Sequence, residues 1–230
     1  MNARPEPPRL SIVIPVLDES GVIRDVVARA RGEADEVVVC DGGSTDATLD
    51  LARHAGSVVC SAPRGRGRQL DHGAAAASGD VLLFLHADTL LPPGAGAAVL
   101  WAAAHSGWGC FSVRIESTDP RLRWCGRYMT TRARQTGSVT GDMAIWCRRA
   151  WYDQVGGFGP RGVCEDLDFA QRLRAIAPGL VLPLRVGTSA RRWEAEGVTQ
   201  TILRMWMVRS AFYAGASEST LARLYRSRPR

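Results

Sequence analysis

Short apolar runs alternate with helical patterns between residues 10 and 105. Four of these runs are largely apolar, as in strands that are buried on both faces: residues 10–16, 36–40, 57–61 and 81–85. Helical patterns follow at residues 21–30, at 49–54 and in the alanine-rich stretch before Asp80. This order predicts a parallel sheet with helices on both faces, as in Rossmann-like α/β proteins.

The pattern changes at about residue 106. Residues 107–115 alternate only partly, as in a half-exposed or antiparallel strand. Further strands are predicted at 141–146 and 180–186, and helices at 120–135, 148–158, 165–176 and 199–213. We expect one α/β domain over residues 10–215, mostly parallel over 10–105 and mixed or antiparallel over 106–215, with a flexible leader (1–9) and a basic C-terminal tail (216–230).

Two polar residues, His86 and Asp88, follow the apolar run 81–85. In an extended chain they would project to the same side, and open α/β sheets bind ligands at the carboxyl ends of their strands. Asp88 offers a hard oxygen ligand that can hold Mg²⁺ or Mn²⁺ against a diphosphate. The alternative is that Asp88 caps the next helix.

Two more strand ends carry candidate ligand-binding residues. The run 36–40 leads into DGGSTDAT, where Gly43 allows close backbone approach and Asp41 and Asp46 offer carboxylates to a base or a ribose hydroxyl. The run 57–61 leads into a basic, glycine-spaced loop whose Arg64, Arg66 and Arg68 can hold phosphate, although a solvated face is the alternative for Arg66.

The second half adds carboxylates and an aromatic cluster. Glu165, Asp166 and Asp168 open a predicted helix, where negative charge is favoured, and we interpret Asp168 as a residue that only interacts with the helix dipole. Arg192 and Trp193 suit phosphate binding and ring stacking, with core packing as the alternative for Trp193. The apolar helix at 199–213 needs a cover, either the domain itself, a second copy or a membrane surface.

The amino-acid composition limits which partners the protein can bind and which catalytic chemistry it can use. The net charge of +6 and the pI near 9.4 favour a nucleotide, a phosphorylated substrate or a membrane surface. All 29 basic residues are arginine, which excludes a Walker lysine, a Schiff-base lysine and a lysine base. The six cysteines form no CxxC pair, and no stretch is apolar enough to span a bilayer, so we expect a cytoplasmic protein.

The order of these signals resembles the family 2 glycosyltransferases. The signals that carry this resemblance span residues 10 to about 215. They are Pro15 with Asp18-Glu19, DGGSTDAT, an acidic turn after LLFLHAD, VGGF before a Glu-Asp pair, and Arg-Arg-Trp. The resemblance implies a GT-A fold and inverting transfer of a hexose from a nucleotide-diphosphate sugar, with Mg²⁺ or Mn²⁺. It makes residues 10–105 the nucleotide-binding half and 106–215 the acceptor-binding half.

The resemblance also implies roles by position. The nucleoside would lie against Pro15, Asp18, Glu19, Asp41, Gly43 and Asp46, and the diphosphate against Arg64 and Arg68. Asp88 matches the last aspartate of the metal-binding DxD motif, with His86 and Ala87 beside it. Asp166 matches the catalytic base, with Glu165 as its neighbour, and Arg192 and Trp193 resemble the RW element near the donor phosphates and acceptor. The implied partners are a nucleotide sugar and a small-molecule or lipid-like hydroxyl acceptor, not a nucleic acid.

A narrower resemblance is to a short bacterial subgroup described as arsenosugar-biosynthesis-like or selenium-associated transferases. It is carried by PRGRGRQ, GDVLLFLHADTLLPPGA, TGDMAIWCRRA and TSARRWE. Two residues depart from these patterns: His86 replaces the first aspartate of DxD, and Met143 stands where the subgroup often has a polar residue. A metal site with His86 and Asp88 as ligands is expected, because imidazole can bind Mn²⁺.

Three alternatives compete with a glycosyltransferase. A sugar nucleotidyltransferase would carry a lysine-containing phosphate loop after the first strand, where this chain has the acidic turn Leu17-Asp18-Glu19. A Rossmann oxidoreductase would carry GxGxxG at the same place, and the sequence has none. A nucleotide-binding protein with weakened catalysis stays open because of His86.

Overall fold

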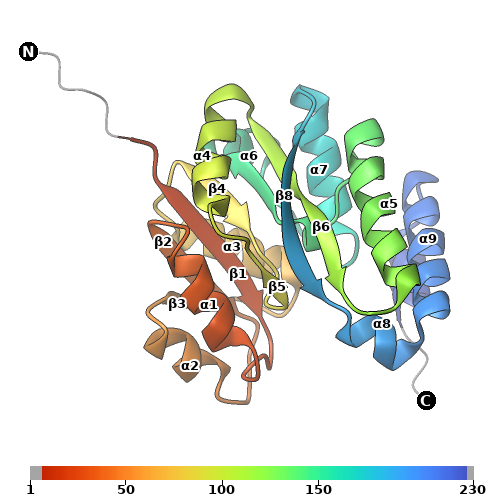
Figure 1. Cartoon of the computed structure of the whole chain (residues 1–230), viewed down its shortest axis with the longest axis horizontal. Coiled ribbons are helices and arrows are strands. Elements are labelled where there is room, and N and C mark those ends of the chain that lie inside the picture. The colour runs from red at the N-terminus through yellow and green to blue at the C-terminus, as the bar shows by residue number, and fades with distance from the viewer. Residues whose placement is uncertain (1–6, 227–230) are drawn as a thin grey trace, which may run out of the picture.

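The computed structural model describes residues 7–226, so most of the expected leader and the last residues of the expected tail lie outside it. Within this range the strands form one eight-stranded sheet in the order β3-β2-β1-β4-β7-β6-β8-β5 (Figure 1). The strands are β1 (Leu10–Val16), β2 (Glu36–Asp41), β3 (Val58–Ser61), β4 (Val81–Phe84), β5 (Thr89–Leu90), β6 (Trp108–Glu116), β7 (Ile145–Arg148) and β8 (Leu180–Ser189).

The first half of the sheet is parallel, as predicted. β1 pairs in parallel with β2 and β4, and β2 pairs in parallel with β3. Every residue of β1 and β4 is buried, which explains their unbroken apolar sequence. The connecting helices are α1 (Ile23–Arg31), α2 (Thr48–His54), α3 (Arg66–Ala76) and α4 (Ala95–His105), with α1 and α4 on one face of the sheet and α3 on the other (Figure 1).

The second half is mixed, which confirms the predicted change at residue 106. β7 runs antiparallel to both β4 and β6, β6 pairs in parallel with β8, and β5 pairs antiparallel with β8. Of the two expectations for residues 107–115, the half-exposed strand is wrong, because β6 is buried at each position from Trp108 to Val113, while the antiparallel one is confirmed by the pairing of β6 with β7. Helix α5 covers this strand and packs against both β6 and β8.

The remaining helices are α5 (Pro120–Thr136), α6 (Arg149–Val155), α7 (Glu165–Ile176), α8 (Arg191–Glu196), α9 (Val198–Tyr213) and α10 (Glu218–Tyr225). Of the boundaries that differ from prediction, two concern the cavity described below. The segment at 141–146 begins with a 3₁₀ turn, η1 (Gly141–Met143), and becomes a strand only at Ile145. The expected tail contains α10, which packs on α9 through the fully buried Leu221.

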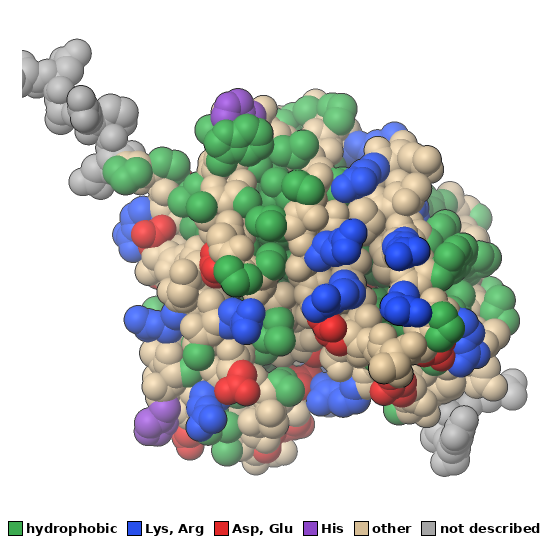
Figure 2. Space-filling model, viewed as in Figure 1, with side chains coloured by type: hydrophobic (Ala, Val, Ile, Leu, Met, Phe, Trp, Pro, Cys, Tyr) green, Lys and Arg blue, Asp and Glu red, His purple; other side chains and the backbone are tan. Residues whose placement is uncertain are grey.

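Helix α9 is covered by the domain on one side only. It packs against α5, α8 and α10, while Leu203, Trp206 and Met207 stay exposed. Figure 2 shows basic side chains gathered over α5, β6 and β8, with hydrophobic side chains beside them at the edge of the molecule formed by α9. Among residues 7–226, the helices are too short or too polar to cross a bilayer.

Two contacts join the halves of the sheet at the carboxyl end of β4. The chain turns after β4 and pairs with β8 at the far edge, where the Thr89 and Thr188 hydroxyls lie 3.2 Å apart and the Ser189 amide donates to the Asp88 carbonyl at 3.1 Å. These contacts place the predicted ligand-binding residues at the junction of the halves.

Candidate active site

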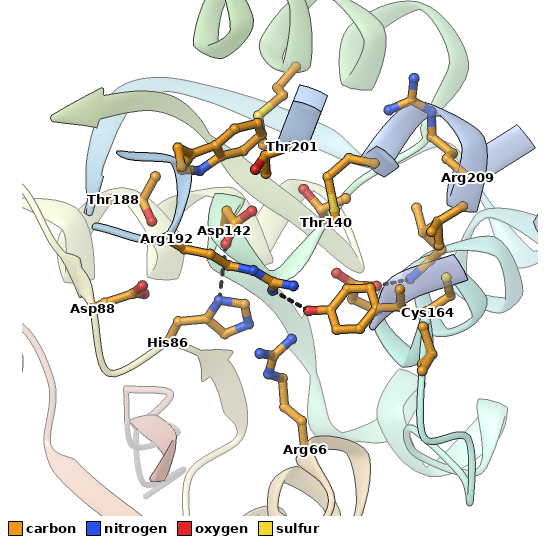
Figure 3. Close-up of a pocket in the computed structure, with 18 of the residues that line it drawn as sticks. Arg66, His86, Asp88, Thr140, Asp142, Cys164, Thr188, Arg192, Thr201 and Arg209 are labelled. Atoms are coloured by element: carbon orange, nitrogen blue, oxygen red, sulfur yellow. Dashed lines mark hydrogen bonds and ion pairs between the residues drawn. The ribbon is translucent and has the colours of Figure 1, made fainter. Parts of the chain in front are cut away.

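A cavity of about 740 Å³ opens at this junction, lined by the ends of β1, β4 and β8 and by residues of α5, α7, α8, α9 and α10 (Figure 3). Its volume suits a substrate-sized ligand. Both Asp88 and Asp166 line it, although they come from opposite halves of the chain. The other predicted site residues in its wall are Pro15, Glu19, Arg64, His86, Ala87, Glu165, Arg192 and Trp193.

Asp88 lies in a turn rather than in an extended strand. The Thr89 amide donates to the His86 carbonyl at 3.1 Å, so the expected extended geometry is wrong, yet both His86 and Asp88 line the cavity. The alternative that Asp88 caps the next helix is also wrong, because Gly94 occupies the N-cap of α4. The Asp88 carboxylate therefore has no capping role that would account for its position.

His86 is held by two neighbours from η1. Its Nδ1 lies 3.2 Å from Asp142 Oδ1, and a Cβ added to Gly141 would lie 2.2 Å from its Nε2. Burial opposes the charge of Asp142, but His86, and after it Arg66 and Arg192, lower the pKa of that carboxyl. Sequence reasoning missed Asp142 because it treated residues 141–146 as a strand. Met143, in contrast, is fully buried in the core.

A divalent cation fits the Asp88 end of the cavity if a diphosphate supplies most of its ligands. Among residues 7–226, no three His, Cys, Asp or Glu side chains are grouped to hold a metal ion. Mg²⁺ is commonly bound by one or two carboxylates together with substrate phosphates, which Asp88 and the arginines of this cavity allow. His86 as a second ligand stays a prediction. Its Nδ1 lies against Asp142 and is therefore not free to bind a metal ion.

Glu165 and Asp166 begin α7 but face different partners. Cys164, the N-cap, has φ +62°, a left-handed conformation that non-glycine residues seldom adopt and that often marks a functional site. Glu165 is 3% exposed and lies 3.4 Å from Arg66 Nη1. Burial and the adjacent Asp166 raise the pKa of Glu165, opposed by Arg66. Glu165 thus holds Arg66 at the cavity.

The Asp166 carboxylate is fixed by backbone donors. Its Oδ2 accepts from the Gly141 amide and its Oδ1 from the Leu167 amide, both at 2.7 Å. The neighbouring Cys164 thiol also lines the cavity, but burial, with the charges of Asp166 and Glu165, raises its pKa to about 12. A thiolate nucleophile is therefore disfavoured, and Asp166 is the oriented, half-buried base candidate in this wall.

Asp168 does more than interact with a helix dipole. Its two carboxylate oxygens accept from Arg161 Nε at 3.1 Å and from Arg172 Nε at 2.9 Å. Arg172 also donates to the carbonyls of residues 155, 157 and 158, while Asp71 accepts from the amides of residues 158 and 159. Arg172 and Asp71 thus hold the VGGF loop through its carbonyls and its amides, and this loop leads to the start of α7.

Arg68 lies outside the cavity wall, so its predicted phosphate contact stays a prediction. The basic segment that sequence reasoning treated as a loop becomes helical at Arg66, and side chains two positions apart on a helix point in different directions. Arg66 therefore lines the cavity, whereas Arg68 is exposed outside it. The charge of Glu165 raises the pKa of Arg66 against the effect of burial. Arg66 thus stays cationic beside the carboxylates.

Four residues predicted to contact the nucleoside lie outside the cavity wall and order two loops. Asp41 accepts from the Gly43 and Ser44 amides, and Asp18 accepts from the Thr45 amide at 2.8 Å. Asp46 joins the same loops by accepting from the Ser20 amide at 3.1 Å. The predicted nucleoside contacts of Asp18, Asp41, Gly43 and Asp46 therefore stay predictions, while Pro15 and Glu19 reach the cavity.

Helix α8 brings further positive charge. Arg191 donates to Glu19 Oε2 at 3.1 Å, so it connects α8 to the first loop. Arg192 donates to the Tyr225 hydroxyl at 2.5 Å, and its Cζ lies 4.6 Å from the Tyr225 ring centre. Trp193 agrees with both of its predicted roles, ring stacking and core packing, because it lines the cavity and packs against the core.

Residues 106–215 were predicted as the acceptor-binding half, but the residues that form the wall opposite the nucleotide-binding half were not among the predicted site residues. This wall is formed by α5 and α9 and the segment before η1, and its polar members are Tyr128, Arg132, Thr140, Thr201 and Arg209. The sequence carries a weak signal for it, because arginine and tyrosine interrupt the buried face of the predicted helix at 120–135.

Residues 11–146 match the model of the family described as Glycosyl transferase family 2. A PGL/p-HBAD biosynthesis glycosyltransferase of Mycobacterium bovis (strain BCG / Pasteur 1173P2) is 30% identical over 212 residues, which cover 85% of this chain and 81% of that protein. The glucosyl-3-phosphoglycerate synthase of Mycobacterium tuberculosis (strain ATCC 25618 / H37Rv) is 33% identical over 96 residues, covering 36% of this chain and 30% of that enzyme's length.

Solved structures share the fold. The mannosyltransferase PcManGT from Pyrobaculum calidifontis, in complex with GDP-Man and Mn²⁺, aligns with a TM-score of 0.60 at 21% identity, over 81% of this chain and 59% of that one. The glucosyl-3-phosphoglycerate synthase from M. tuberculosis, in complex with Mg²⁺ and UDP, gives 0.57 at 19% identity, over 79% and 70%. The fold is thus the GT-A type. The chain belongs to glycosyl transferase family 2.

Proposed function

We propose that this protein transfers a sugar from a nucleotide-diphosphate sugar to a hydroxyl acceptor with inversion at the anomeric carbon. The observation that carries the proposal is the meeting of Asp88 and Asp166 in one cavity that also contains Arg64, Arg66 and Arg192. This arrangement offers a site for a diphosphate leaving group and a base in the same space. Membership of family 2 supports it.

The donor would lie with its diphosphate among the arginines. Arginine binds phosphate through paired N–H groups, and Glu165 keeps Arg66 in place. When bound between Asp88 and the diphosphate, Mg²⁺ or Mn²⁺ would neutralise negative charge on the leaving group. The complexes of the two structural neighbours, with GDP-Man and Mn²⁺ and with UDP and Mg²⁺, support a nucleotide donor and a divalent cation here.

Asp166 would act as the single base. As the acceptor oxygen bonds to the anomeric carbon, the hydroxyl proton passes to Asp166, and the bond from that carbon to the diphosphate oxygen breaks with its electron pair on the diphosphate. The two backbone amides at 2.7 Å fix the carboxylate of Asp166, which lines the cavity. A positioned base contributes on the order of 10²- to 10⁴-fold to the rate.

The exposed face of α9 favours contact with a membrane surface. Leu203 and Met207 are more than half exposed there, and the net charge of +6 complements an anionic lipid surface. We propose a cytoplasmic protein that binds the inner face of the membrane through this helix. Co-sedimentation with anionic but not neutral vesicles tests this, whereas dimerisation in solution would assign the face to a second copy.

Release of nucleoside diphosphate from a panel of nucleotide sugars, with Mn²⁺ or with EDTA, tests the reaction. Metal-dependent turnover is expected, and NMR of the product should show inversion. If the protein binds nucleotides tightly but turns over none of the nucleotide sugars, it is instead a nucleotide-binding protein with weakened catalysis. The narrower resemblance to arsenosugar-biosynthesis-like or selenium-associated transferases is a proposal within this one, carried by the quoted sequence segments.

A further inference from the structure

The cavity wall formed by α5 and α9 contains buried polar atoms that neighbouring protein groups leave unsatisfied. Arg132 is 8% exposed, and its Nε donates to the Ser138 carbonyl at 3.0 Å. Its Nη2, and the hydroxyls of Thr140 and Thr201, have no hydrogen-bond partner among residues 7–226. All three residues line the cavity. Since unpaired buried polar groups are costly, this wall is arranged for a polar ligand.

The charge in this wall is positive. Arg209 lines the cavity beside Arg132, and the two guanidinium carbons lie 5.8 and 6.0 Å from the Tyr128 ring centre. Within the part of the chain that the structure describes, neither arginine forms an ion pair. Burial and the charge of Arg209 lower the pKa of Arg132. A bound anion would relieve this repulsion.

This positive wall lies away from the donor arginines. Arg64 and Arg66 come from the nucleotide-binding half, whereas Arg132 and Arg209 come from α5 and α9. Figure 3 shows Asp88 and Arg209 at opposite sides of the close-up, with Asp142 and Thr140 between them. Thr140 precedes Gly141, whose amide donates to the Asp166 carboxylate, so this wall adjoins the base in the chain.

We propose that the acceptor carries a carboxylate or phosphate group that binds Arg132 and Arg209. The Thr140 and Thr201 hydroxyls donate to the same anion or to the adjoining part of the acceptor, and the reacting hydroxyl faces Asp166. This inference rests on the proposed sugar transfer and specifies its acceptor as an anionic hydroxy compound.

The test compares three probes that share hydroxyl groups and differ in charge: glycerol, glycerate and glycerol 3-phosphate. Calorimetric titration of the full chain, saturated with UDP and Mg²⁺, keeps the donor phosphate site occupied. Glycerate or glycerol 3-phosphate should bind while glycerol does not, and whichever binds more tightly distinguishes carboxylate from phosphate. Arg209→Gln should weaken that binding by about 10- to 100-fold, the effect of one lost charged hydrogen bond.

A second substitution keeps the test informative if Arg209→Gln fails to fold, and a control variant tests for nonspecific effects of losing a charge. Thr201→Val removes only a hydroxyl and should weaken the charged probe by several fold. Arg127→Gln is the matched control, because Arg127 is exposed on the same helix and outside the cavity, and it should bind the probes like wild type.

Equal binding of glycerol and the charged probes, or an Arg209→Gln affinity equal to wild type, would overturn the inference. So would an equal loss of UDP affinity in Arg209→Gln, because the arginines would then belong to the donor site. If wild type binds the anions but neither UDP nor any nucleotide sugar, the anion site stands and the proposed sugar transfer fails.

Discussion

Replacing Asp166 with asparagine should remove the base and keep one of the two hydrogen bonds that position its side chain. The carboxylate accepts two backbone hydrogen bonds at 2.7 Å, from Gly141 and Leu167. An asparagine oxygen can replace only one of these acceptors, and its amide group would face the other N–H. We expect a stability loss of about 1–3 kcal/mol, the usual effect of leaving a partly buried donor unpaired. Turnover should fall at least roughly 100-fold, because the neutral amide cannot take the proton.

The assay measures nucleoside diphosphate release, with UDP affinity and urea unfolding measured on the same samples. Glu165→Gln is the matched comparison, since it makes the same isosteric change at the adjacent carboxylate that pairs with Arg66. We expect Asp166→Asn to bind UDP nearly as wild type does, and Glu165→Gln to retain turnover within about tenfold. Turnover of Asp166→Asn within tenfold of wild type, or an equal loss in Glu165→Gln, would refute the assignment of the base.

Three further changes test other parts of the site. Asp88→Ala should abolish the metal dependence of nucleoside-diphosphate binding, and calorimetry that gives the same affinity with Mn²⁺ and with EDTA in both proteins would remove Asp88 from the donor site. Gly141→Ala would place a methyl group 2.2 Å from His86 Nε2 and should destabilise the protein by about 1–3 kcal/mol in urea unfolding, whereas Gly21→Ala, with open space around it, should cost under about 1 kcal/mol. Hydrogen bonds from the Thr48 hydroxyl and from Ser20 lower the pKa of Asp46, so its stabilising contribution is present above pH 4 and is lost as the pH falls below it. The stability difference between wild type and Asp46→Ala should accordingly shrink between pH 6 and pH 3, and a difference independent of pH would contradict the role of its charge.

The nucleotide-binding half could be predicted from sequence because β1 and β4 are buried at every position and β2 at all but its first, although the edge strand β3 is partly exposed. Continuous apolar runs such as Leu10–Val16 leave no other assignment, and polar residues at their ends indicated the site. Family resemblance then identified Asp88 and Asp166, whose meeting in one cavity depends on pairings that no local pattern reveals. The short β5 is an example, since it leaves β4 and pairs with β8 at the far edge of the sheet.

The remaining errors have local physical causes. The glycine-spaced segment around Arg66 was predicted as a loop, but it is the first turn of α3, so of the predicted Arg64, Arg66 and Arg68 only the first two line the cavity. Asp142 was assigned to a strand because its neighbours are apolar, although Gly141 begins a 3₁₀ turn. Arg132 was hidden because a buried arginine in a helix is indistinguishable in sequence from an exposed one.

Diffraction from crystals grown with UDP and Mn²⁺ tests the central claim most directly, because anomalous scattering locates the manganese ion. The account predicts an anomalous peak in contact with the Asp88 carboxylate and the diphosphate, inside the cavity that Asp166 lines. A nucleotide bound outside that cavity, or a manganese ion with no contact to Asp88, would contradict it.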